Sequence, residues 1–152
     1  AAHVDIPGLV AYARERNVIL DVMQRRQPWF HDAAAVMAAA ETGRLTGMVA
    51  GHAVTTVFYL LAKYGSRDAA RMRVAELLRV LKVAPVDGEV AAYALALPYG
   101  DFEDAVLMAA ADRAGAHYVV TRDRTLFAAG PVPAVTPGEM LALLSQRSAA
   151  GR

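Results

Sequence analysis

The chain has 152 residues, the length of one ordinary domain, and its 56% hydrophobic content can supply a sizeable core. Its 16 Lys and Arg residues are nearly balanced by 15 Asp and Glu, which excludes a polycation that coats nucleic acid through bulk charge. Cysteine is absent, so the sequence offers no disulfide framework, thiol nucleophile or thiolate metal site. It also lacks the pattern of a signal peptide, and we expect a cytoplasmic protein.

The N-terminal elements admit two interpretations. Residues 9–13 could form a first strand, followed by a helix over residues 18–25. Alternatively, residues 7–23 could form one continuous helix. Further along the chain, an Ala-rich stretch predicts a helix over residues 31–42, which Gly43 stops.

The segment over residues 45–62 carries no formal charge. Its length is close to the minimum for a membrane span. Its Gly, Thr and His residues favour a strand, a turn and a buried helix instead, so we expect no membrane segment. The sequence predicts a strand over residues 46–50 and a helix over residues 52–64. Ser66 is then suited to N-cap a helix over residues 67–82.

The second half alternates short apolar strands with helices. The sequence predicts, in order, a strand over residues 83–86, a helix over residues 87–97, a helix over residues 101–114, a strand over residues 117–121, a helical turn over residues 126–128 and an edge strand over residues 132–135. Thr136 and Glu139 form a capping box around Pro137, so a last helix begins there.

This alternation predicts an α/β fold of three layers, with a short, mostly parallel central sheet flanked by helices. We expect a single domain over residues 1–147 and a frayed tail over residues 148–152.

Acidic residues gather where predicted strands and helices meet. Asp101, Glu103 and Asp104 stand at a helix start, Asp123 follows a strand by two residues, and Glu15 follows the uncertain first strand. The carboxyl ends of strands are where open α/β sheets bind ligands. Carboxylate oxygens suit Mg²⁺ or Mn²⁺, and such an ion can promote phosphodiester hydrolysis.

Each of these acids also has a simpler interpretation. Asp101 is a natural N-cap, and Asp104 lies three residues later, as in a capping box. Asp123 is typical of a turn, and Glu15, between two arginines, is typical of a solvated surface charge. Spacing alone therefore leaves capping and metal binding open.

Several segments share a pattern with one known family. They are Asn17-Val-Ile-Leu-Asp21-Val, Gln27-Pro28-Trp29 with His31-Asp32-Ala33, Asp101-Phe-Glu-Asp104-Ala, Tyr118-Val-Val-Thr121-Arg122-Asp123, and Val135-Thr-Pro137-Gly-Glu139-Met-Leu141. In this order they resemble the opening motif, the following loop and helix, the acidic helix start, the late strand and the closing helix of PIN-domain proteins of bacterial toxin–antitoxin systems. The resemblance covers about residues 12–144.

The resemblance implies a ribonuclease that depends on Mg²⁺ or Mn²⁺ and acts as a toxin, silenced by a small antitoxin protein and often dimeric. Its metal would be held by Glu15, Asp101, Asp104 and Asp123. The catalytic residues would be Asp104, Asp101 and Asp123. Asn17 and Thr121 would position the site by hydrogen bonds. The residues predicted to contact RNA phosphates are Arg25, Arg26, Arg122 and Arg124.

Three departures from the family pattern support an alternative function. Glu15 stands where the family has its first aspartate, and Thr56 or a neighbour stands where many members carry a glutamate. Leu126-Phe127 replaces a frequent Asp-Phe pair. The alternative is a catalytically impaired PIN fold that binds RNA or a protein. An unrelated phosphotransfer domain is a third interpretation, but it would need a lysine near the site, and only Lys63 and Lys82 are present.

Overall fold

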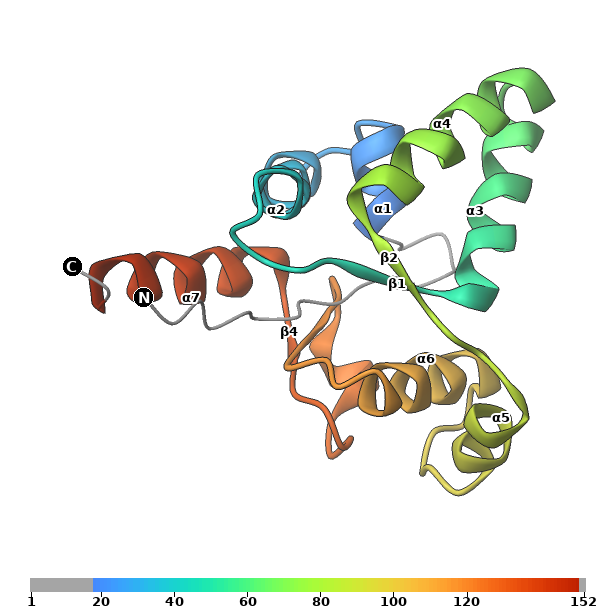
Figure 1. Cartoon of the computed structure of the whole chain (residues 1–152), viewed down its shortest axis with the longest axis vertical. Coiled ribbons are helices and arrows are strands. Elements are labelled where there is room, and N and C mark those ends of the chain that lie inside the picture. The colour runs from blue at the N-terminus through green and yellow to red at the C-terminus, as the bar shows by residue number, and fades with distance from the viewer. Residues whose placement is uncertain (1–17, 151–152) are drawn as a thin grey trace.

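A computed structural model describes residues 18–150 of the chain (Figure 1). The predicted strand over residues 9–13, and the part of the alternative helix before Val18, lie outside the described residues. The elements follow the order α1 (Val18–Met23), α2 (Phe30–Glu41), β1 (Met48–Ala50), α3 (Gly51–Lys63), α4 (Arg67–Val80), β2 (Lys82–Ala84), α5 (Gly88–Leu95), α6 (Phe102–Arg113), β3 (Val119–Val120), the 3₁₀ turn η1 (Arg124–Phe127), β4 (Ala134–Val135) and α7 (Pro137–Ala150).

The strands form two parallel pairs. β1 pairs with β2, with Val49 opposite Val83, and β3 pairs with β4, with Val120 opposite Val135. In Figure 1, β1 and β2 cross between helices α1 to α4 on one side and helices α5 and α6 on the other. The predicted three-layer α/β architecture is therefore confirmed. Within residues 18–150, however, the strands make two short sheets rather than one central sheet.

Local capping explains where the helices begin. The Ser66 hydroxyl accepts a hydrogen bond from the Ala69 N–H at 3.1 Å, and the Asp87 carboxylate accepts one from the Val90 N–H at 3.0 Å. These side chains satisfy amide groups that the first turn of a helix leaves without partners. Gly43, after α2, has a φ of 79°, a conformation that glycine adopts without steric cost.

The closing helix begins with the predicted capping box. The Thr136 hydroxyl accepts from the Glu139 N–H at 3.2 Å, and the Glu139 carboxylate accepts from the Thr136 N–H at 3.0 Å. The helix continues to Ala150. The tail predicted over residues 148–152 therefore starts too early, since its first three residues are helical, and residues 151–152 lie outside the described range.

Helix α6 contains the longest unbroken run of buried residues in the described fold. Every residue from Asp104 to Ala111 is buried, so the helix lacks a polar face through its middle turns. It packs with α5 and against β1 and η1. A second apolar cluster joins α1, α2 and α7 through residues such as Val36 and Met140. No helix within residues 18–150 is both long and apolar enough to cross a bilayer.

Candidate functional site

Two of the predicted acids lie at the start of α6. Asp101 is the N-cap, and its Oδ1 accepts the Asp104 N–H at 3.1 Å. The Asp104 side chain faces inward, and the residue is only 5% exposed. The capping interpretation of Asp101 is therefore correct. Asp104 is different, because a buried carboxylate is costly unless a hydrogen bond, a cation or a metal compensates its charge.

Asp123 lies just beyond β3, where the sequence places it. The buried Thr121 follows the strand, its N–H donates to the Val135 carbonyl at 2.9 Å, and its hydroxyl accepts the Asp123 N–H at 3.3 Å. Asp123 Oδ1 accepts the Thr125 N–H at 3.0 Å and so caps the 3₁₀ turn η1. Thr121 thus fixes the backbone that presents Asp123.

Tyr99 and His52 bring further polar groups to the start of α6. Burial, and then the nearby Asp104 charge, raise the pKa of Tyr99, so this phenol lies beside the buried carboxylate. Its hydroxyl donates to the Phe127 carbonyl at 3.4 Å. Burial lowers the pKa of His52, at the start of α3, and the adjacent Glu103 charge acts in the opposite direction. The start of α3 and the start of α6 therefore lie close together.

The described acids do not complete a metal site by themselves. Among residues 18–150, no three His, Asp or Glu side chains lie close enough together to hold a metal ion. The predicted group of Asp101, Asp104 and Asp123 is therefore not a three-carboxylate cluster. Glu15 and Asn17, the other predicted site residues, lie outside the described residues. The donors present are carboxylate oxygens, which is the chemistry that Mg²⁺ and Mn²⁺ prefer.

Beneath the loop that carries Asp123 lies a buried ion pair. Arg122 Nε is 3.0 Å from Asp21 Oδ2, and the two side chains are 10% and 0% exposed. Burial raises the pKa of Asp21, while the positive charges of Arg122 and then Arg26 favour the ionised form. Arg122 was predicted to contact RNA phosphates. The structure gives it an internal role instead, because its charge is occupied by Asp21.

Trp29 covers the outer side of this ion pair. The Arg122 guanidinium carbon lies 3.7 Å from the centroid of the Trp29 ring, which is a close cation–π contact. Trp29 is nevertheless 43% exposed. Asp21, Arg122 and Trp29 thus form a stack that runs from the interior to the surface.

The remaining predicted phosphate contacts are nearer the surface. Arg25 is exposed, and Arg26 donates from Nε to Gln24 Oε1 at 2.9 Å. Arg124 pairs with Glu139 at 2.8 Å, with side chains that are 61% and 40% exposed. An exposed pair of this kind is worth little energy and can open for a phosphate.

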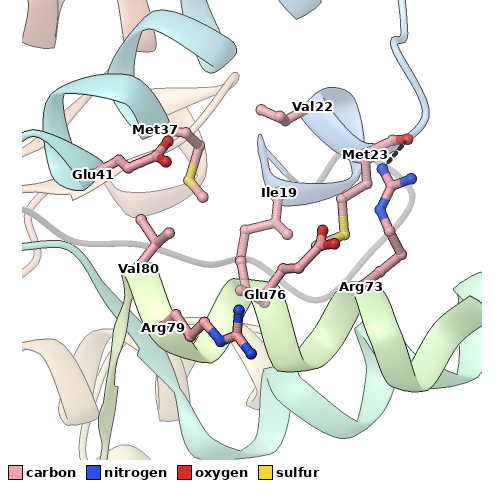
Figure 2. A pocket seen from close by; sticks show the side chains of 10 residues that line it. Ile19, Val22, Met23, Met37, Glu41, Arg73, Glu76, Arg79 and Val80 are labelled. Carbon is pink, nitrogen blue, oxygen red and sulfur yellow. Dashed lines mark hydrogen bonds between the residues drawn. The ribbon is translucent and has the colours of Figure 1, made fainter.

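A surface groove of about 410 Å³ lies elsewhere, between α1, α2 and α4. Figure 2 shows Ile19 and Met23 from α1, Met37 from α2 and Val80 from α4 around an apolar floor. Charged side chains of both signs surround it: Glu41, Arg73, Glu76 and Arg79. Arg73 also donates to the Met23 carbonyl at 2.9 Å, which ties α4 to the end of α1. None of the predicted catalytic residues lines this groove.

Three residues that matter here were not among the predicted site residues, although Asp21 and Trp29 belong to the family-like segments. Asp21 could have been found as an acid inside an apolar run, because burial of a charge requires a partner. Trp29 is the only tryptophan in the chain. Tyr99 showed no signal, since it follows a helix-breaking proline in what resembles an ordinary loop.

The fold agrees with the family comparison. A family model described as PIN domain matches residues 15–125, well over half of the chain. The chain therefore belongs to the PIN-domain family, as its motifs indicated. A comparison with curated proteins finds no match.

Three solved structures are similar in fold. The Mycobacterium tuberculosis toxin VapC20, described as cleaving the sarcin-ricin loop, has a TM-score of 0.61 and 20% identity over 80% of this chain and 94% of its own. A toxin–antitoxin complex from Klebsiella pneumoniae gives 0.60 and 20% over 79% and 92%. VapBC2 from Rickettsia felis, bound to a promoter DNA fragment, gives 0.56 and 12% over 78% and 91%. At these identities the likeness establishes the fold alone.

The buried ion pair leads to a prediction about stability. Asp21→Ala should destabilise the fold by about 3–5 kcal/mol, because it leaves the Arg122 charge buried without its counter-charge. The double variant Asp21→Leu with Arg122→Met removes both charges and should cost less than Asp21→Ala alone. Urea unfolding followed by circular dichroism measures both. A double variant that is less stable than the single one would show that the pair itself stabilises the fold.

Proposed function

We propose that this PIN-domain protein hydrolyses RNA phosphodiester bonds in the cytoplasm and is the toxin of a toxin–antitoxin pair. The observation that carries the proposal is the buried Asp104 carboxylate in the first turn of α6. Burying a carboxylate is costly unless its charge is compensated, and a bound divalent cation would compensate it. Family membership and the similar fold of a toxin described as cleaving the sarcin-ricin loop support the same chemistry.

In this proposal, Glu15, Asp101, Asp104 and Asp123 hold Mg²⁺ or Mn²⁺. The bound ion would lower the pKa of a water molecule and offset negative charge on the phosphate. The chain's own residues fix the ligands: Asp101 caps α6, and Thr121 holds the backbone of Asp123. Asn17 completes the positioning groups.

The substrate's phosphates would meet positive charge at the loop before α2. Arg25 and Arg26 lie in this loop, and Arg124 lies beyond Asp123. The N-terminus of α6 adds a favourable dipole for an anion, since its first N–H groups point out of the helix. Arg122 is left out of this set because Asp21 already holds it.

We further propose that the groove between α1, α2 and α4 receives a segment of the antitoxin. Its floor is apolar and its rim carries both acidic and basic side chains, as an amphipathic peptide segment requires. Exposed apolar side chains elsewhere, such as Leu95 at 77% and Phe102 at 50%, support a homodimer.

The alternative is an impaired PIN fold that binds RNA or a protein without cutting. It is favoured by Glu15 in the place of the family aspartate, and by the lack of a three-acid group among residues 18–150. Measuring metal binding and RNA cleavage distinguishes the ribonuclease from the binding module.

Asp104→Asn should abolish RNA cleavage and lower Mn²⁺ affinity by at least about 10–100-fold, the loss typical even for a residue that only supports a ligand. Glu103→Gln, an exposed neighbour, is the matched control and should change neither value by much. Calorimetric titration with Mn²⁺ and cleavage of single-stranded RNA measure the two effects. Binding of RNA by a wild type that neither binds metal nor cuts would favour the binding-module alternative.

The salt dependence of RNA affinity should reveal how many arginines contact phosphate groups. Each phosphate contact on single-stranded RNA contributes about −0.7 to the slope of log affinity against log salt. Arg25 and Arg26 alone give about −1.4, and Arg124 would bring the slope to about −2.1. Binding of a fluorescent oligonucleotide across a salt series measures this value. A slope of about −2.8 would mean that Arg122 leaves Asp21 to contact RNA.

Met37→Asp should weaken capture of the antitoxin, because it places a charge on the apolar side of the groove. Ala38→Asp is the matched control, since Ala38 is exposed on the same helix and does not line the groove. The measurement is co-purification with a co-expressed candidate antitoxin, together with the unfolding midpoint of each variant. Equal capture by both folded variants would place the antitoxin on another surface.

A further inference from the structure

We propose that Trp29 is a stacking platform for one base of the RNA substrate, next to the acids that would cut the chain. The inference rests on the proposed ribonuclease function and adds a specific binding residue to it. It is carried by the geometry of Trp29, Arg122 and Asp21, and by the basic residues of the same loop.

Trp29 is partly exposed although one face of its ring is covered. Arg122 stacks on the ring with its guanidinium carbon 3.7 Å from the centroid. The Arg122 side chain is itself only 10% exposed, so the covered face is the one toward the interior. Since Trp29 as a residue is still 43% exposed, we infer that the ring face opposite Arg122 contributes to this area. That face would be open to a ligand.

The ring is also held in place before any ligand arrives. The guanidinium beneath it contacts Asp21, which is completely buried and belongs to α1. A side chain fixed in this way loses little conformational entropy when a base stacks on it. An exposed aromatic ring that is rigid and backed by a buried charge has the features of a binding surface.

The position of the ring matches a nucleic-acid strand that reaches the acidic residues. Arg122 directly precedes Asp123 in the chain, so the ring lies within the reach of one arginine side chain from the backbone next to that acid. Arg25 and Arg26 belong to the same loop as Trp29. Aromatic rings interleaved with basic side chains are the usual means of binding single-stranded nucleic acid, with phosphates on the cations and bases on the rings.

A purely structural role predicts something different. If Trp29 only shields the Asp21–Arg122 pair from water, its replacement should lower stability and leave RNA affinity unchanged. If it is a platform, affinity should fall in protein that remains folded.

The chain offers a direct probe, because Trp29 is its only tryptophan and all indole fluorescence comes from this position. The full-length protein is titrated with short single-stranded RNA in EDTA, which prevents metal-dependent cleavage. Stacking should quench the fluorescence along the same curve as binding measured with a labelled oligonucleotide. Trp29→Leu should weaken binding by about 5- to 140-fold, the range typical of losing one stacked base.

Two variants serve as controls. Trp29→Phe keeps an aromatic face and should recover most of the affinity. Tyr64→Leu removes a more exposed aromatic ring after α3 and should change nothing. Circular dichroism establishes that each variant is folded.

The outcomes separate the inference from the proposed function. RNA binding without quenching, together with unchanged affinity of folded Trp29→Leu, would overturn the platform, and cleavage by the wild type with Mn²⁺ would still leave the ribonuclease in place. Quenching by the antitoxin but not by RNA would assign Trp29 to the protein partner and would also overturn it. A wild type that binds no RNA at all would overturn both.

Discussion

The burial of α6 is the constraint on which the rest of this structure depends. All eight residues from Asp104 to Ala111 are buried, so the helix must be covered on every side by α5, β1, η1 and their neighbours. A helix packed in this way cannot shift or rotate without opening the core. Its first turn is therefore a rigid place for the Asp104 carboxylate.

The aspartates of the described structure have different structural roles. Asp101 and Asp123 each accept a hydrogen bond from a backbone N–H through a carboxylate oxygen, and so define where α6 and η1 begin. Asp21 is buried against a guanidinium, which compensates a charge that has lost its water. Asp104 is buried at a helix start, where the dipole favours negative charge. Similar side chains therefore serve as caps, as an internal counter-charge and as a candidate ligand, according to their surroundings.

Helix α1 links the two proposed binding regions although it has only six residues. Ile19 and Met23 are four residues apart and share the face that lines the groove. Asp21 lies between them in sequence and points the other way, toward Arg122. A partner in the groove and a strand of RNA near Trp29 would therefore lie toward opposite faces of the same short helix.

The sequence by itself determined the helices and the family. The periodicity of apolar residues, the capping residues Ser66, Asp87 and Asp101, and the Thr136–Glu139 box are local signals, and local hydrogen bonds in the structure follow them. The four strands predicted within residues 18–150 were placed near the observed ones but were too long. Strand length depends on how far two segments distant in the chain stay in register, and the local pattern does not contain that information.

Only the tertiary structure decided what the charged residues do. Asp21 and Arg122 are a hundred residues apart in sequence, and nothing local to either one indicates that they meet or that Trp29 covers them. The groove is likewise formed by three helices, none of which has an unusual sequence alone. Capping is settled by neighbours within one turn. Ion pairing, burial and the shape of a surface are settled by elements that come together only when the whole chain has folded.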